Sequence, residues 1–284
     1  MKRHLIIIIL FVIGVISFTE TGFSMDPKNS PVAEKTPKNS KIHLFSGKNL
    51  DGWYTFLKGK GRNIDPNQVF TVSEGMIRIS GEEFGCITSN EAYENYKLEV
   101  EFKWGELTFP PRVANARDSG VLIHSTGEDG AFSGIWMHSI ECQLIEGGTG
   151  DLLVVGDGTP KFSLTCPVEK AKQSGSYIFK SGGNPATINS GRINWWGRDQ
   201  EWKDIKGFRG AKDQEKAHGK WNQLTIIAEG KEVTIYLNGK LVNHAIDVQP
   251  QKGRIQVQSE GAETLFRRID LTPLGQWKNE RMKK

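Results

Sequence analysis

Apolar and polar residues alternate with a period of two along most of this chain, which is the pattern of half-buried β-strands. The clearest run spans residues 96–104, where one face is apolar and the other is charged: Leu98, Val100, Phe102 and Trp104 against Lys97, Glu99, Glu101 and Lys103. No segment shows the 3.6-residue apolar period of an amphipathic helix. Short alternating runs separated by turn signals predict an all-β sandwich or jelly roll.

The other expected strands follow the same pattern and end at Gly, Asn or Pro turn signals. They are 68–72, 76–79, 86–88, 119–125, 136–146, 152–155, 221–229, 232–238, 240–243, 254–258 and 265–271. Residues 157–220 show little periodicity, so the sequence predicts a long loop there. Loops of that length in a compact domain are uncommon and often functional.

The first residues are not expected to belong to the fold. Lys2 and Arg3 precede an apolar run from Leu5 to Phe18, and small residues follow near Ser24. This is the pattern of a cleaved signal peptide, and the run is short for a membrane span of roughly 20 residues. We therefore expect a signal peptide at 1–24, a linker at 25–41, a jelly-roll domain at 42–274 and a basic tail at 275–284. The expected location is periplasmic or secreted, without stable membrane insertion after cleavage.

Charge and cysteine content exclude two classes of protein. The net charge is only +4, and Lys and Arg are scattered rather than clustered in a stripe. No nucleic-acid partner is therefore expected. The three cysteines are too few for a disulfide framework, and no Cys-x-x-Cys pair suggests zinc. Cys86, Cys142 and Cys166 are expected to be buried thiols, or to form one bridge.

The densest chemistry lies in two neighbouring expected strands, 119–124 and 136–145. Alternation places Ser139, Glu141 and Gln143 on one face of the second strand, while Ile140, Cys142 and Leu144 face the core. In the first strand, Leu122 and His124 are expected to share a face. A strand pair that turns a carboxylate, an amide and an imidazole away from the core could form the floor of a site.

Several motifs in this order resemble the 3-keto-disaccharide hydrolase family, long catalogued as domain of unknown function 1080. They are the opening run 44–53 (LFSGKNLDGW), RDSGV at 117–121, IECQLI at 140–145, WN at 221–222 with LNG at 237–239, and GRIQVQ at 253–258 with FRRI at 266–269. The resemblance covers residues 42–274. It implies a concanavalin A-like jelly roll of two antiparallel sheets with a concave sugar cleft. The chain differs from the family at His124, where many members carry Arg, and in a longer region at 147–215.

The resemblance also implies cleavage of glycosides whose sugar is oxidised at C3. A ketone at C3 acidifies the proton on C2, so a base can remove it, and the group on C1 then leaves by β-elimination before water adds. Such a site needs a base near C2 and a positive or hydrogen-bonding group near the C3 oxygen. Glu141 is the first candidate for the base. The alternative is that Glu141 is simply an exposed residue on a sheet face without a catalytic role. His124 is the second candidate, as base, acid or metal ligand, unless it is a structural histidine.

Other residues are candidates for holding the sugar. Arg117 and Asp118 precede a strand at the expected cleft rim, although Asp118 could simply hold a turn. Gln143, Gln256 and Gln258 are amides that suit sugar hydroxyls, or they are ordinary polar positions of a solvated sheet. His138 is expected on the face opposite Glu141 unless a bulge reverses it. The stacking candidates are Trp136, Trp195 and Trp196; at least one of the adjacent pair 195–196 should line a surface or cleft.

A divalent cation stays an open possibility. His124, Glu141, Glu146 and Asp151 could supply ligands that stabilise an enolate, and a structural Ca²⁺ is an equal alternative. Two other functions also remain open. Glu141 and Glu146 have the spacing of the catalytic strand of laminarinase-like endo-β-glucanases, with Gln143 in place of the central Asp. The fold would equally suit a non-catalytic carbohydrate-binding module.

Overall fold

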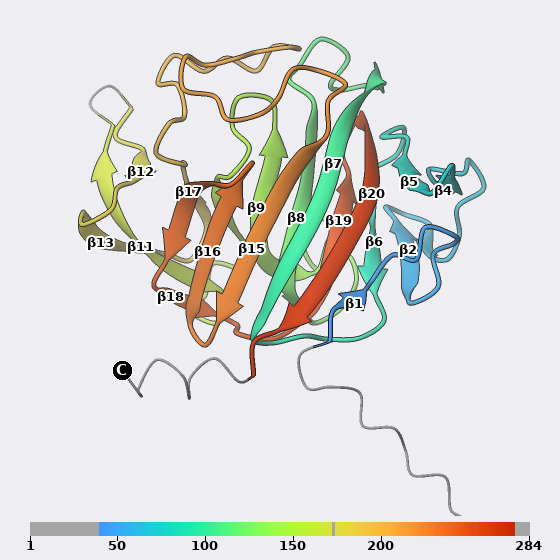
Figure 1. Ribbon diagram of the computed structural model, residues 1–284, viewed down its shortest axis with the longest axis horizontal. Coiled ribbons are helices and arrows are strands. Elements are labelled where there is room, and N and C mark those ends of the chain that lie inside the picture. Colours follow the sequence, from blue (N-terminus) through green and yellow to red (C-terminus); the bar gives the residue numbers. More distant parts are fainter. Residues whose placement is uncertain (1–39, 172–173, 276–284) are drawn as a thin grey trace, which may run out of the picture. The chain divides into compact units, whose positions relative to one another are not determined.

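The computed structural model describes residues 40–171 and 174–275, and Figure 1 shows them as a stack of β-sheets. The expected signal peptide, all but two residues of the expected linker and all but the first residue of the expected tail lie outside the described residues. Within the described ranges there is no helix. The predicted all-β jelly roll is therefore confirmed. In the same ranges no helix is long and apolar enough to cross a membrane.

The first sheet, here called the β7 sheet, has eight antiparallel strands in the described residues. Their order is β17 (Lys240–Ala245), β16 (Glu232–Leu237), β15 (Asn222–Glu229), β7 (Tyr96–Thr108), β20 (Ala262–Pro273), β5 (Met76–Ile79) and β4 (Phe70–Ser73), with β1 (Ile42–His43) also paired to β20. The two longest strands, β7 and β20, are neighbours at its centre. The alternation predicted for 96–104 is confirmed, and the strand continues to Thr108.

The second sheet, here called the β9 sheet, also has eight strands among the described residues. Their order is β14 (Gly191–Ile193), β10 (Leu152–Val155), β9 (His138–Ile145), β8 (Asp118–Thr126), β19 (Arg254–Ser259), β6 (Gly85–Ser89), β2 (Trp53–Leu57) and β3 (Gly61–Arg62). The predicted strand pair is thus β8 and β9, which lie side by side at the centre of this sheet.

Residues 157–220 do not form the long loop that the sequence predicts. They contribute β14 to the β9 sheet and most of a smaller third sheet, made of β12 (Tyr177–Phe179), β11 (Ser163–Lys170), β13 (Asn184–Ile188) and β18 (Asp247–Gln249). Figure 1 shows this sheet at the edge of the sandwich. A proline inside a strand removes a hydrogen-bond donor and masks the strand pattern. Here Pro167 and Pro185 lie directly opposite each other in the β11–β13 ladder.

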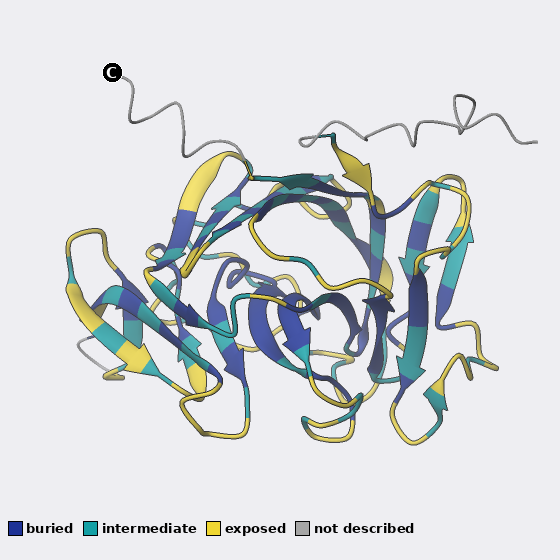
Figure 2. Cartoon of the chain, turned by 90° about the horizontal axis from the view of Figure 1, so that it is seen from below, coloured by how far each residue is buried: buried dark blue, intermediate teal, exposed yellow. Residues whose placement is uncertain are grey.

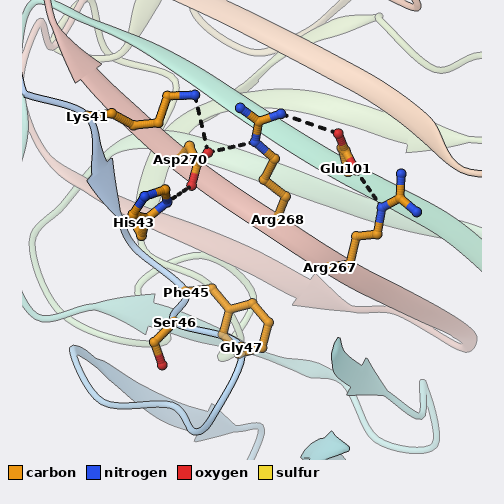
Figure 3. Close-up of a pocket in the computed structure, with 9 residues that line it drawn as sticks. All are labelled: Lys41, His43, Phe45, Ser46, Gly47, Glu101, Arg267, Arg268 and Asp270. Carbon is orange, nitrogen blue, oxygen red and sulfur yellow. Dashed lines mark hydrogen bonds and ion pairs between the residues drawn. The ribbon is translucent and has the colours of Figure 1, made fainter. Parts of the chain in front are cut away.

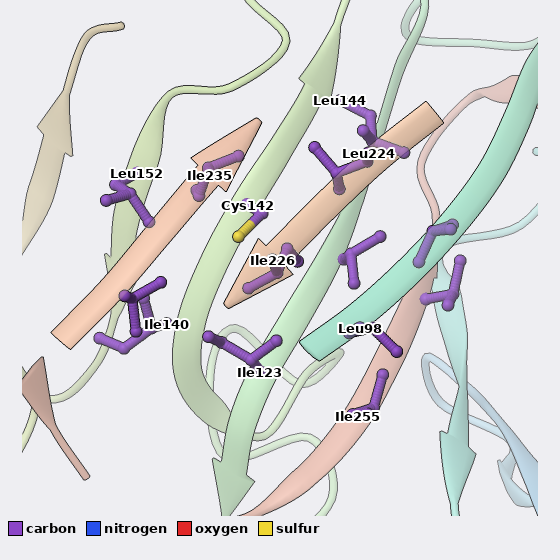
Figure 4. Packing of buried hydrophobic residues seen from close by; sticks show 14 of the residues in the cluster. Leu98, Ile123, Ile140, Cys142, Leu144, Leu152, Leu224, Ile226, Ile235 and Ile255 are labelled. Carbon is purple, nitrogen blue, oxygen red and sulfur yellow. The ribbon is translucent and has the colours of Figure 1, made fainter. Parts of the chain in front are cut away.

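The apolar core fills the space between the two large sheets. Figure 4 shows Leu98, Leu224 and Ile226 of the β7 sheet packed against residues of the β9 sheet such as Ile140 and Leu144. The buried positions follow the strands through the middle of the sandwich in Figure 2. All three cysteines are free and buried, so the thiol alternative holds rather than the bridge. Since Ile140, Cys142 and Leu144 face this core, the other face of β9 is available for a site.

Candidate active site

Polar side chains form an ordered grid on the face of the β9 sheet that is turned away from the core. Leu122 is paired with Gln256 on one side and with Glu141 on the other, and Glu141 is paired in turn with Leu153. Leu153 is also paired with Arg192 at the edge strand β14. Residues directly opposite in antiparallel strands share a face. Glu141 and Arg192 therefore flank Leu153 on one surface.

This surface encloses a cavity of about 230 Å³. Carboxyl groups, two amides, one guanidinium and an apolar wall line it. The lining residues are Asp118, Glu141, Gln143, Gln258, Glu260, Arg192, Gly191, Leu153, Val154, Val155, Phe132 and Trp136. Of the residues chosen from the sequence, Glu141, Asp118, Gln143, Gln258 and Trp136 are thus brought together. The cavity combines acid–base groups with an aromatic wall, as a sugar-cleaving site would need.

Glu141 is buried on the cavity floor, with 4% of its surface exposed. Burial, and next the charge of Asp118, raises the pKa of Glu141 to about 8. The charge of Arg192 acts in the opposite direction. A buried carboxyl with a pKa near neutrality can exchange a proton with a substrate, because neither of its protonation states is strongly favoured.

Asp118 is a second buried carboxyl on the same wall. Its Oδ1 accepts a hydrogen bond from the Gln143 amide, and its Oδ2 lies 3.3 Å from Nη2 of Arg112. Burial raises the pKa of Asp118 to about 7 in spite of the Arg112 charge. Gln143 also donates to the carbonyl of Ser119, so its amide is held in place. Asp118 is thus the first residue of β8 and lines the cavity, and it does not lie in a turn.

Gly120 lies at the centre of the grid and carries no side chain. A Cβ at this position would overlap Oε1 of Glu141 and Oε1 of Gln258. The absence of a side chain lets the carboxyl from β9 and the amide from β19 meet above β8. Neither polar atom of the buried Gln258 amide has a partner of good hydrogen-bond geometry among the described residues, although the amide lies close enough to Glu141 to lower the pKa of that carboxyl against the larger effect of burial. Unpaired buried amides are costly, so these atoms are suited to receive a substrate hydroxyl.

Glu260 and Arg192 are the polar cavity-lining residues that the sequence reasoning missed. Glu260 follows Gln258 by two positions, so strand alternation could have placed it on the same face. Burial and the charges of Asp118 and Glu141 raise the pKa of Glu260 well above its usual range. Arg192 lies on a three-residue strand inside the segment predicted as a loop, where the sequence pattern gives no signal.

The prediction that His124 shares the cavity face with Leu122 is wrong. His124 has a φ of +54°, and the pairing of β8 with β9 shifts between Ile123 and Thr126. This bulge turns the ring toward the core, where its edge meets Tyr96 at a centroid distance of 5.9 Å. Nδ1 donates to the carbonyl of Pro250 at 2.8 Å, and burial lowers the pKa of His124 to about 4. His124 is a buried neutral histidine outside the cavity lining.

Arg117 and Glu146 lie away from the cavity and pair with each other. Nη1 of Arg117 is 2.7 Å from Oε1 of Glu146, whose other oxygen accepts from the backbone nitrogens of Arg117 and Gly207. Both residues line a separate cavity of about 620 Å³. The prediction that Arg117 lies at the rim of the cleft is therefore wrong. His138 keeps the predicted parity opposite Glu141, and its ring packs on Phe162 at 4.7 Å.

The other aromatic and amide candidates also separate into cavity and structural positions. Trp136 lines the cavity and stacks on Phe132 with an interplanar angle of 22°. Trp195 is buried and Trp196 is 40% exposed, so one ring of the pair lies at a surface as predicted. Neither of these two rings lines the cavity. Gln256 is buried beneath it, donating to Thr88 and accepting from the backbone of Met137.

A larger hollow of about 470 Å³ lies on the outer face of the β7 sheet (Figure 3). Asp270 is surrounded there by Lys41, His43 and Arg268, while Glu101 pairs with Arg267 and Arg268. Asp270 is buried and Glu101 is half-buried, but each carboxylate is already paired with a cation. The cavity of the β9 sheet is the better candidate site because its carboxyls share one space and burial raises their pKa values, whereas the hydrogen bonds of Asp270 to Arg268 and His43 lower its pKa in spite of burial.

The four residues considered as metal ligands are dispersed. Glu146 is bound to Arg117, while Asp151 accepts from the Trp195 backbone and pairs with Arg192 and Arg198. His124 faces the core. Among the described residues, no group of three or more His, Cys, Asp or Glu side chains is arranged to hold a metal ion. The set proposed from the sequence therefore does not form one ligand shell.

Fold and site together define a concanavalin A-like jelly roll with a carboxyl-lined cavity on one sheet. The chain belongs to the 3-keto-alpha-glucoside-1,2-lyase-like domain family, whose sequence model it matches over residues 40–272. This confirms the family resemblance and makes the chain a carbohydrate-active jelly roll. No curated protein sequence matches the chain.

Solved structures with similar folds include three carbohydrate-related proteins. A Parabacteroides distasonis ATCC 8503 protein provisionally named a glycosyl hydrolase aligns over 83% of this chain and 100% of its own, with 21% identity and a TM-score of 0.48. A carbohydrate-binding module from Bacillus subtilis aligns over 77% and 94%, with 14% identity and a TM-score of 0.42. The Bacillus licheniformis β-glucanase aligns over 84% and 99%, with 11% identity and a TM-score of 0.43.

Proposed function

We propose that this protein cleaves 3-keto-glycosides by elimination followed by hydration, with Glu141 as the base. The observation that carries the proposal is a buried carboxyl with a pKa raised to about 8, facing a cavity with further carboxyls, in a chain of the 3-keto-alpha-glucoside-1,2-lyase-like family. The substrate is a sugar ring oxidised at C3 and linked through C1 to a second group.

The reaction divides into proton transfers that these residues can perform. Ionised Glu141 takes the proton from C2, and the electron pair of that C–H bond forms an enolate with the C3 carbonyl. The enolate then expels the oxygen on C1, which takes a proton and leaves, giving a 1,2-unsaturated 3-keto sugar. Addition of water across the new double bond completes net hydrolysis. A general acid near the leaving oxygen accelerates the second step.

Asp118 and Glu260 are the residues placed to supply that proton. Both line the cavity with Glu141, and burial raises the pKa of each. Neighbouring carboxyls that cannot all ionise divide into proton donors and proton acceptors at neutral pH. The trio can therefore hold a base and an acid in the same cavity at once.

The geometry speaks against the glucanase carboxyl pair that the sequence spacing suggested. A retaining or inverting glucanase needs two carboxyls on either side of one glycosidic bond. Glu146, the partner suggested by the sequence spacing, lines a different cavity and is bound to Arg117. A binding module without catalysis would have no need for three carboxyls with raised pKa values in its pocket, because their burial destabilises the fold.

The test compares three substrates with one protein. Purified protein is incubated with a 3-keto-glucoside, the matching unoxidised glucoside and a β-glucan, and the released group is measured. We expect release from the keto sugar alone. Cleavage of β-glucan would support the glucanase reading, and binding without cleavage would support the module. Glu141→Gln should lower kcat by at least ~100-fold, whereas Glu128→Gln in the exposed loop before β9 should leave it unchanged.

We also propose that residues 1–24 are a signal peptide that is cleaved on export. Export through the signal-like segment 1–24 would place the enzyme in the periplasm or outside the cell. Mass determination of the mature N-terminus after expression of the full chain tests this. A mature protein that begins at Met1 would contradict the proposed cleavage.

A further inference from the structure

The edge strand β14 brings a guanidinium into the cavity from a segment outside the two central strands. β14 pairs with β10, so Arg192 lies directly opposite Leu153, which lies directly opposite Glu141. Adjacent strands are about 4.8 Å apart, which places the Arg192 and Glu141 backbones about 10 Å from each other on one face. Their side chains both line the cavity, on either side of Leu153.

The side chain of Arg192 is more exposed than those of the other two arginines of this region. Arg112 is bound to Asp118, Asp204 and the carbonyl of Ala116, and 15% of its side chain is exposed. Arg198 is bound to Asp151 and lies over the Trp202 ring, with 7% exposed. Arg192 is held at Nη1 by Asp151 at 3.2 Å, yet 36% of its side chain is exposed. Its guanidinium is thus anchored at one end and open to the cavity.

The electrostatic effect of Arg192 reaches the carboxyls across the cavity. Its positive charge lowers the pKa values of Asp118 and Glu141, against the larger effect of burial. An arginine stays charged at every working pH and presents several donors in one plane. It can therefore bind a developing oxyanion without exchanging a proton itself. In the proposed reaction this oxyanion is the C3 oxygen of the enolate.

We infer that Arg192 is a catalytic residue that binds the C3 oxygen and stabilises the enolate formed when Glu141 takes the C2 proton. The inference rests on the proposed function. In this step the C2–H bond breaks, the proton goes to Glu141, and the electron pair becomes the C2–C3 double bond with its charge on the C3 oxygen. The strand carrying Arg192 lies within residues 157–220, so this segment completes the active site.

The experiment measures kcat, KM and the pH profile on a 3-keto-glucoside for the wild type, Arg192→Met and Arg192→Lys. Lys180→Met is the matched control, because Lys180 is an exposed cation of the same segment that pairs with exposed Glu169. We expect Arg192→Met to lose ~100-fold or more in kcat, the effect of removing one oxyanion donor. Arg192→Lys should recover part of it, and the control should match the wild type.

Two further readouts separate catalysis from a structural role. Removing the cation raises the pKa of Glu141, so the rising limb of kcat/KM should move to higher pH in Arg192→Met. In Arg192→Ala, added guanidinium at millimolar concentration should restore part of kcat. An Arg192→Met variant with wild-type kcat and an unmoved pH profile would overturn the inference while leaving the proposed function intact. A wild type without activity on the keto sugar would overturn both.

Discussion

Replacing Glu141 by Gln should lower the activity of this protein but raise its stability. The gain in stability should grow as the pH rises. Glu141 is neutral when protonated, so at pH 5 the buried acid and the buried amide are nearly equivalent. At pH 9 the wild type must hold an ionised carboxylate in a site that disfavours charge. The rise of the Glu141 pKa from 4.5 to about 8 corresponds to about 5 kcal/mol at ~1.4 kcal/mol per unit, which is an upper bound.

The sign follows from proton linkage. A group whose pKa is higher in the folded than in the unfolded state stabilises the fold fully below its unfolded pKa, and this contribution is lost as the pH rises through the folded value. For Glu141 the loss therefore extends from about pH 4.5 to about pH 8. Glutamine does not titrate, so the variant should become progressively more stable than the wild type across that window.

The expected size is smaller than the upper bound because Asp118 shares the raised pKa, and removing one carboxyl relieves the other. We expect Glu141→Gln to be more stable by ~2 kcal/mol at pH 9 and equal to the wild type at pH 5. For a domain of this size, that is a rise in Tm of about 4–8 °C.

The assay is thermal unfolding of both proteins from pH 5 to pH 9 at constant ionic strength, beside the activity measurement. Glu128→Gln, in an exposed loop, is the control and should follow the wild-type curve. A Tm difference that is constant with pH, or that shrinks as the pH rises, would refute the argument that Glu141 is a buried, destabilised carboxyl. Unchanged activity would refute its role as the base.

Three further predictions concern single positions. Gly120→Ala should reduce kcat at least ~10-fold with little change in Tm, because its methyl group displaces the Glu141 and Gln258 side chains; wild-type kinetics would contradict this. Arg198→Met should lower stability by ~1.5–3 kcal/mol in urea unfolding, since buried Asp151 loses one charged partner and keeps only Arg192 and the Trp195 backbone. Tyr96→Phe should unfold at the same or higher urea concentration, because the buried Tyr96 hydroxyl has no partner among the described residues.

The residues that the sequence placed correctly are those on regular central strands. Alternation over 138–145 predicts the side of the sheet for Glu141 and Gln143, because Ile140, Cys142 and Leu144 fill the core and a slip of one residue would put the polar set there. The same rule, continued from Gln258 by two positions, would also have found Glu260. Where a strand is long, paired on both sides and free of bulges, its pattern predicts the face.

The failures have local physical causes. The alternation of side-chain faces along β8 is interrupted at His124, where a left-handed backbone conformation forms a bulge. The pattern of apolar residues does not predict this bulge. The strands within 157–220 are short, lie at sheet edges or contain a proline, so a period of two is not visible over them. Arg192 is the example among the cavity-lining residues, since its strand has only three residues. A residue on such a strand gains its role from the neighbours that β10 gives it, which the local sequence does not encode.

The missing side chain at Gly120 explains why this site can exist at all. A flat sheet face normally spaces its side chains evenly, and carboxyls on separate strands would stay apart. Here the missing side chain at Gly120 lets the Glu141 and Gln258 side chains converge. Buried Asp118 precedes Gly120 by two positions on the same strand. Burial, and for Glu141 next the charge of Asp118, raises the pKa values and destabilises the fold locally, which is typical of active sites rather than of packing. Arg192 then offsets part of that charge from the sheet edge, at the position where an enolate would need it.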